Sequence, residues 1–127
     1  ADHGLTNVKS INIHDYKDIT SLLIRNTSLE PRAINFFVKP DKLDIFKVVF
    51  NGHFGDIFDL YTKQELLNSG LLGPGEKHKM VDAFLGDFIG IAKAEYMFSI
   101  TDKKSYKGHH AGLTLDEMMV PLIVYKK

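Results

Sequence analysis

The chain has 127 residues, 44% of them apolar and 25% charged, which is the composition of a globular protein of about one domain. Its 16 Lys and Arg residues balance 16 Asp and Glu residues, so no basic excess is present to neutralise the phosphates of a nucleic-acid polymer. The chain has no cysteine, which excludes disulfides and thiolate zinc sites and leaves His, Asp and Glu as metal ligands. No apolar run approaches the roughly 18 residues of a membrane helix. From the balanced charge we expect no nucleic-acid polymer as partner, and from the short apolar runs we expect no membrane.

Hydrophobic periodicity and capping residues predict strands that alternate with helices. In chain order, the expected elements are a strand over 10–13, a helix over 15–23, a strand over 32–39, a helix over 40–51, a strand over 57–61, a short helix over 62–70, strands over 88–92 and 96–100, a helical turn over 114–118 and a strand over 120–125. The strands over 88–92 and 96–100 are expected to be joined by a tight turn. This order predicts an α/β fold, or α+β for a fragment, with a mixed sheet and helices.

Local signals support two of these helices and the core. Thr62 followed by Glu65 has the pattern of a capping box, in which each residue satisfies a backbone group of the other. Thr114 is expected to cap the helical turn that follows it. The large apolar residues of 32–101 are numerous enough to bury a core of their own, so the slowest amide exchange is expected in this segment.

Six histidines are present, and two groups of residues could bind a metal ion. His14, His53 and His78 stand alone in the sequence, so a structural or solvent-exposed role is expected for each. Asp2-His3 precedes a glycine, and adjacent loop residues of these types can both turn toward one divalent cation. His109-His110 lies among small residues, where the backbone can approach a site closely. Both pairs can equally be ordinary surface loop residues.

Taken together, the two ends of the chain resemble a known family. The segments 1–4 (Ala-Asp-His-Gly), 108–118 (Gly-His-His-Ala-Gly-Leu-Thr to Glu-Met) and 120–123 (Val-Pro-Leu-Ile) resemble the carboxy-terminal half of the alkaline phosphatase superfamily. Within it, the chain is most similar to the type I phosphodiesterase/nucleotide pyrophosphatase branch. The cofactor-independent phosphoglycerate mutases have similar motifs, but their connection is much shorter than that between His3 and His110.

The resemblance implies a two-metal site. Asp2 and His3 would bind one ion, usually zinc, with manganese as the other possibility, and His110 would bind the second ion. His109 is one position out of register with the family pattern, so an outer-shell or structural role is implied for it. Segments 1–11 and 107–127 would then be metal-loop and core-sheet segments.

The rest of the resemblance concerns the cap and the substrate. Residues 12–106 would be a cap-like insertion, and the substrate a phosphate ester or nucleotide-like small molecule. Its anionic groups could be contacted by basic side chains that are otherwise solvated surface charges, namely Arg32, Lys39, Lys103, Lys104 and Lys107. The family's Thr or Ser nucleophile lies upstream of the Asp-His-Gly loop, so no catalytic residue is assigned here.

These implications give several expectations. The chain resembles part of a metal-dependent phosphodiesterase or phosphatase, and alone it is expected to be inactive and to bind zinc weakly or not at all. A cytoplasmic location is expected, with an upstream signal segment left open. The strand over 120–124, central in the parent sheet, would lack partners, so it is expected either to promote self-association or to refold against the cap. The alternative is a non-catalytic α+β binding module.

Overall fold

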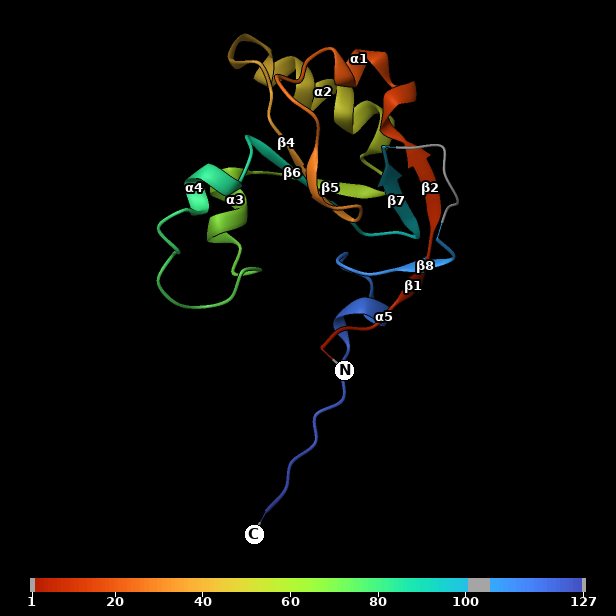
Figure 1. The fold of residues 1–127 in the computed structure, drawn as a ribbon, viewed down its shortest axis with the longest axis vertical. Helices are drawn as coiled ribbons and strands as arrows, with labels where there is room; N and C mark the ends of the chain where they lie inside the picture. The colour runs from red at the N-terminus through yellow and green to blue at the C-terminus, as the bar shows by residue number, and fades with distance from the viewer. Residues whose placement is uncertain (1, 101–105, 127) are drawn as a thin grey trace.

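The computed structural model describes residues 2–100 and 106–126 (Figure 1). Two short 3-10 helices, Ile13–Asp15 and Pro40–Lys42, precede the first two α-helices. In chain order, the strands and α-helices are β1 (Thr6–Asn7), β2 (Lys9–Asn12), α1 (Lys17–Thr20), β3 (Ser28–Glu30), β4 (Ala33–Phe36), α2 (Leu43–Phe54), β5 (Phe58–Thr62), α3 (Lys63–Asn68), α4 (Val81–Phe84), β6 (Phe88–Ala92), β7 (Tyr96–Ser99), β8 (Gly108–His109) and α5 (Leu115–Met118). None of the helices described is long and apolar enough to cross a membrane.

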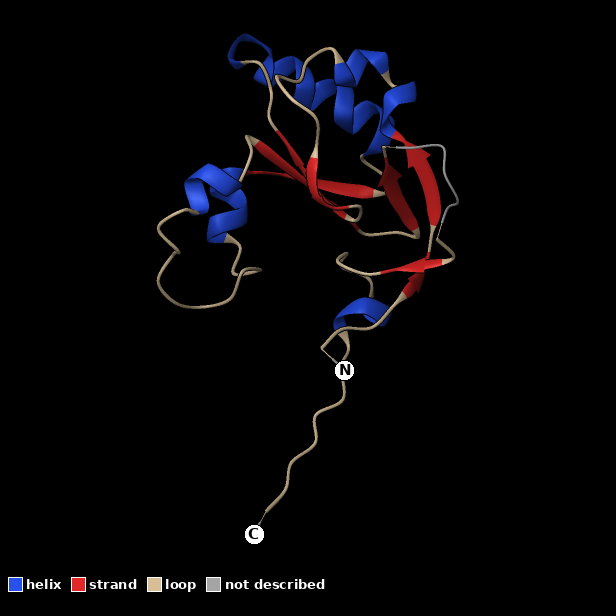
Figure 2. Ribbon diagram, in the orientation of Figure 1, coloured by secondary structure: helices blue, strands red, loops and turns tan. Residues whose placement is uncertain are grey.

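The strands form three sheets. The largest is antiparallel with the order β3-β4-β6-β5, and β3 is therefore one of its edges. The second sheet pairs β2 with β7 in parallel, and the third pairs β1 with β8 antiparallel. Figure 2 shows helices above the largest sheet and the small β1–β8 sheet below it, next to α5. The fold is thus mixed α/β, as the order of predicted elements indicated.

A phenylalanine core fills the space between α2 and one face of the largest sheet. Phe46, Phe50 and Phe54 recur every fourth residue of α2 and are buried. Phe50 contacts Phe36 on β4 with ring centroids 5.3 Å apart, and Phe98 on β7 at 6.3 Å. The core thus joins α2 to two different sheets. Its aromatic residues lie in the predicted segment 32–101, but Ile13 and Ile19, which precede that segment, are buried in the same core.

The opposite face of the sheet carries a smaller core. Because successive strand residues point to opposite faces, Ile89 and Ile91 of β6 pack here, against Leu66 of α3 and Leu85. The predicted capping box starts α3. The Thr62 hydroxyl accepts a hydrogen bond from the Glu65 amide (3.2 Å), and the Glu65 carboxylate accepts one from the Thr62 amide (2.7 Å).

Several local predictions differ from the structure. The helix expected over 15–23 is confined to Lys17–Thr20, and Leu23 instead forms an isolated bridge with Val38. The strands β1, β3 and β8 and the helix α4 were not predicted. Each is only two to four residues long, which is too short for a periodic pattern to register.

Two larger differences concern strand partners. β6 and β7 are separated by a short turn as predicted, but they lie in different sheets, because β7 pairs with β2 from the start of the chain. The strand predicted over 120–125 is absent: this segment has no regular secondary structure, extends from the body, and leaves Ile123 89% exposed (Figure 1). An apolar run forms a strand only where a partner strand satisfies its backbone, and the described residues provide none for it.

Candidate metal centre

The two ends of the chain meet in space. Thr6 faces His109 in the β1–β8 ladder, and the Val8 amide donates to the Lys107 carbonyl at 3.0 Å. The Gly4 amide donates to the Glu117 carbonyl, also at 3.0 Å. A Cβ atom on Gly4 would collide with the Asp116 carbonyl oxygen, so the close approach requires glycine. Backbone pairing thus places the Asp-His-Gly loop beside α5.

His3 and His110, which the resemblance assigned to two metal ions, lie against each other. Their rings are stacked with centroids 3.9 Å apart and an interplanar angle of 16°. His3 Nδ1 lies 2.8 Å from the Gly4 carbonyl oxygen, so it carries the proton and donates it. The His3 Nε2 lone pair is then left for a metal, which is the arrangement usual in metal-binding histidines. Asp2 is exposed and precedes His3 directly.

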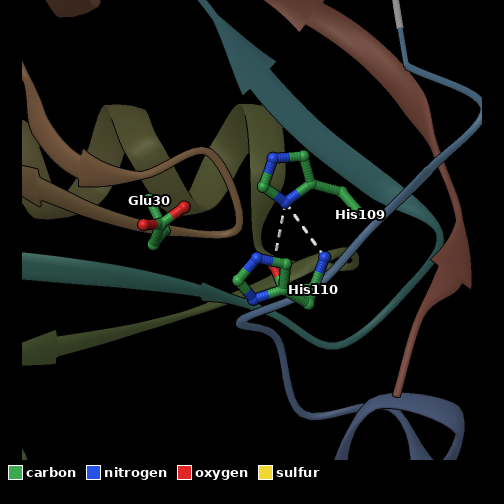
Figure 3. Close-up of side chains that lie close together, drawn as sticks. All are labelled: Glu30, His109 and His110. Carbon is green, nitrogen blue, oxygen red and sulfur yellow. Dashed lines mark hydrogen bonds between the residues drawn. The ribbon is translucent and has the colours of Figure 1, made fainter. Parts of the chain in front are cut away.

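His110 also belongs to a second group of possible ligands, with Glu30 and His109 (Figure 3). One ligand atom each of Glu30, His109 and His110 lies within 4.8 Å of the others, and within the described part of the chain this is the one such group of three. The His109 and His110 rings are stacked with centroids 5.1 Å apart. The sequence did not predict Glu30, and no local signal marks it, because it comes from the edge strand β3.

A buried ion pair holds β3 and β4 against the histidine loop. Arg32 Nε and Nη2 donate to the two carboxylate oxygens of Glu117 at 2.5 and 2.6 Å, and both side chains are almost fully buried. Arg32 Nη1 also donates to the carbonyls of Ala94 (2.9 Å) and Tyr96 (2.5 Å). The interpretation of Arg32 as a substrate contact or solvated charge is therefore wrong, since its guanidinium is 0% exposed and engaged within the protein.

Glu117 in turn fixes the loop that follows His110. Its carboxylate accepts from the Gly112 amide (2.8 Å) and from the Thr114 amide and hydroxyl (3.1 and 2.5 Å). Burial of this carboxyl would by itself raise its pKa. The hydrogen bonds from Arg32, Thr114 and Gly112 outweigh burial and lower the pKa from 4.5 to about 2. Glu117 is thus ionised at neutral pH and binds the Arg32 strand and the histidine loop together.

Backbone strain is concentrated beside the ligand group. Leu29 and Ala111 have φ of 67° and 80°, and no other non-glycine residue in the described ranges has a positive φ. Leu29 directly precedes Glu30, and Ala111 directly follows His110. For residues with a Cβ, this conformation costs roughly 1–2 kcal/mol each. Such strain persists where surrounding structure enforces it, often at functional sites.

The remaining candidates among the described residues do not belong to this ligand group. Lys39 donates to the Ser21 carbonyl at 2.7 Å, and Lys107 is exposed beside β8. Of the three isolated histidines, His14 is exposed, His53 Nε2 lies 2.5 Å from an Asp18 carboxylate oxygen, and His78 accepts from the Met80 amide at 3.2 Å. Lys103 and Lys104 fall outside the described residues.

A mostly apolar hollow of about 230 Å³ adjoins Glu30. β3 and β7 form its walls, and Tyr106 lies at its lining. A hollow of this kind could bury part of a small organic group next to the cluster of ligands.

Comparisons with known proteins identify a similar fold. No protein-family model matches the sequence, and a search of curated proteins found no match. Two solved structures of murine ectonucleotide pyrophosphatase/phosphodiesterase 5 match with TM-scores of 0.55 and 0.56 and 17% identity; one holds AMP in an inactive variant. The matches cover 87% and 88% of this chain and 28% of the murine one. The chain therefore has a mixed α/β fold similar to part of a nucleotide pyrophosphatase/phosphodiesterase.

Proposed function

We propose that this chain is part of a metal-dependent phosphodiesterase or phosphatase that hydrolyses phosphate esters at a two-metal site. Asp2 and His3 would bind one ion and His110 the other, with zinc as the first choice and manganese as the second. The nucleophile would lie outside this sequence. The observation that carries the proposal is the stacking of His3 on His110, which joins two motifs from opposite ends of the chain.

The donor set fits this role. Imidazole and carboxylate are the ligands that zinc takes when no thiolate is present. The hydrogen bond from His3 Nδ1 to the Gly4 carbonyl (2.8 Å) selects the tautomer in which Nε2 is free. The likeness of the fold to a phosphodiesterase supports the same class of reaction, and the AMP in that structure suggests a nucleotide-like ester as the substrate.

The chain's own residues would bind and orient the reacting groups. When bound, two such ions stabilise charge on the attacking, leaving and non-bridging oxygens of a phosphoryl group. Asp2, His3 and His110 would fix where that charge is stabilised. The stacked rings hold His3 and His110 at a set separation, and the β1–β8 ladder holds the loops that carry them.

The test is hydrolysis of bis-p-nitrophenyl phosphate by the full-length protein that carries this chain, after removal of metal and readdition of zinc or manganese. We expect His3→Ala and His110→Ala each to reduce the metal-dependent rate by at least about 100-fold, since even outer-shell partners cost 10–100-fold. His78→Ala, an exposed histidine outside the centre, is the matched control and should retain the rate.

Three outcomes would contradict the proposal. Full activity of His3→Ala and His110→Ala would remove both residues from the metal site. Metal-dependent hydrolysis by the 127-residue chain alone, lost in His110→Ala, would place the nucleophile within this sequence. If no phosphate ester is hydrolysed by the full-length protein with either metal, the non-catalytic binding module becomes the better account.

A further inference from the structure

Glu30, His109 and His110 form a group of possible metal ligands. The family resemblance does not assign these three residues to one ion. The ligand atoms of the group all lie within 4.8 Å of one another. Two imidazoles and one carboxylate with an open position are the ligand set of many catalytic zinc sites. Figure 3 shows the Glu30 carboxylate beside the two rings, and Glu30 comes from β3, a strand of a different sheet from β8.

A buried ion pair connects the segments that carry the three residues. Glu30 is two residues from Arg32, whose guanidinium binds the Glu117 carboxylate. That carboxylate accepts the amide of Gly112, two residues after His110. The buried ion pair therefore links the backbone that carries Glu30 to the backbone that carries the histidines.

The backbone at both histidines orients the two rings to one side. Adjacent strand residues normally point to opposite faces. Here β8 ends at His109 and Ala111 has φ of 80°, so the chain turns at His110 and the two rings stack with an interplanar angle of 15°. Leu29, which also has a positive φ of 67°, lies in β3 directly before Glu30.

His109 can offer a free nitrogen without losing its local hydrogen bond. Its Nδ1 lies 2.9 Å from the His110 amide nitrogen and 3.1 Å from the His110 carbonyl oxygen. Nδ1 is therefore paired in either neutral tautomer. The tautomer that donates to the carbonyl leaves Nε2 as a metal ligand.

The distances between the three ligand atoms need to decrease only slightly for a metal ion to be bound. Zinc bonds of about 2.0–2.2 Å to N and O bring the ligands of a tetrahedral site to about 3.3 Å from one another, so the group must close by at most about 1.5 Å. Glu30 is exposed, and rotation of its long side chain can bring its carboxylate closer to the rings, whereas closure between His109 and His110 requires rotation of their stacked rings. The exposure of Glu30 also leaves an open position toward solvent and the adjoining hollow.

We propose that Glu30, His109 and His110 form a zinc site made entirely by this chain. It deepens the proposed function and rests on it only in using His110 as a ligand. His109 thereby changes from an outer-shell residue to a ligand, and Glu30 becomes the third. The chain then binds zinc without the upstream part of the protein, in contrast to the weak binding expected from counting ligands in the sequence.

The test is calorimetric titration of the metal-free 127-residue chain with zinc chloride, with thermal unfolding as a second readout. We expect one zinc per chain and an increase in Tm on zinc addition. Glu30→Gln and His109→Ala should each weaken zinc binding by at least about tenfold and abolish most of the increase in Tm. Glu76→Gln and His78→Ala, both exposed in the 73–78 loop, are the matched controls and should leave zinc affinity unchanged.

Variants of the other proposed ligands separate the two hypotheses. Asp2→Asn and His3→Ala should weaken zinc binding by the isolated chain less than Glu30→Gln and His109→Ala do. If zinc binding instead depends on Asp2 and His3 and not on Glu30 and His109, the present proposal is wrong while the two-metal function stands. Absence of zinc binding by a chain whose circular dichroism and unfolding transition are normal would also overturn it, and hydrolysis by the full-length protein would then decide the function separately.

Discussion

Replacing Glu117 by Gln should strongly destabilise the protein. The substitution keeps the shape of the side chain, and Gln also serves as the last residue of a capping box, so the start of α5 is preserved. What disappears is the negative charge that receives Arg32 Nε and Nη2 at 2.5 and 2.6 Å. The Arg32 guanidinium, 0% exposed, is then left as a buried charge without a counter-charge.

The size of the effect follows from two independent considerations. Removing one partner of a buried ion pair costs about 3–5 kcal/mol. The pKa of Glu117, lowered from 4.5 to about 2, corresponds to about 3 kcal/mol of stabilisation at neutral pH, at 1.36 kcal/mol per unit. For a chain of this length, such a loss lowers Tm by roughly 10–20 °C.

The assay is urea and thermal unfolding followed by circular dichroism, at pH 7 and at lower pH. Because the pKa of Glu117 is depressed in the folded state, its stabilisation is complete above pH 4.5 and is lost as the pH falls through about 2. The difference in unfolding free energy between the parent and Glu117→Gln should therefore shrink below pH 4.5. The double variant Arg32→Met with Glu117→Gln should recover at least about 1 kcal/mol. A loss below about 1 kcal/mol in Glu117→Gln at pH 7 would refute the reasoning.

Three further predictions concern packing and assembly. Gly112→Ala should lower the unfolding free energy by about 1–3 kcal/mol, because a Cβ there would lie 2.5 Å from Arg32 Nη2 and 2.8 Å from the Ala92 carbonyl oxygen. Gly52→Ala, in α2 with open space around it, should instead raise the unfolding free energy by up to about 1 kcal/mol. Equal effects of the two substitutions in urea titrations would contradict this prediction. Phe50→Ala should lower the unfolding free energy by about 3–5 kcal/mol, while Phe84→Ala, exposed by 62%, should change it by less than about 0.5 kcal/mol. Deleting residues 120–127 should leave Tm unchanged but abolish concentration-dependent self-association in sedimentation experiments. A parent chain that is monomeric at all concentrations would show that the exposed apolar tail does not pair with a second copy.

The parts of the fold that depend on neighbouring residues could be predicted from the sequence. The capping box at Thr62, the cap at Thr114 and the helix after Pro40 each follow from a few adjacent side chains. β6 is buried at every position, and it appeared in the sequence as an apolar run. The predicted end of the helix after Pro40 was less accurate, because α2 continues to Phe54. The side chain of Phe54 is buried in the core, and this packing rather than local preference extends the helix.

The parts that depend on distant partners could not be predicted. β7 pairs with β2, about 85 residues earlier, and nothing within 96–99 distinguishes that partner from β6. Arg32 has the sequence context of a surface charge, and its burial depends on distant partners: Glu117, 85 positions away, and the carbonyls of Ala94 and Tyr96. The same separation explains why Glu30 was missed: its neighbours at the metal centre come from the other end of the chain.

The distance along the chain between Arg32 and Glu117 also has a consequence for how the protein opens. Bringing together residues 85 positions apart carries a loop-closure cost of about 4 kcal/mol in chain entropy, whereas the β3–β4 turn, where Glu30 faces Ala33, closes over only a few residues. We therefore expect segments 2–8 and 106–118 to separate from the phenylalanine core as one cooperative unit, at a lower free energy than global unfolding. An ion bound between Glu30 and the histidines would act as a reversible cross-link on that step. Amide exchange in these two segments would then slow on metal binding, while exchange in α2 would not change.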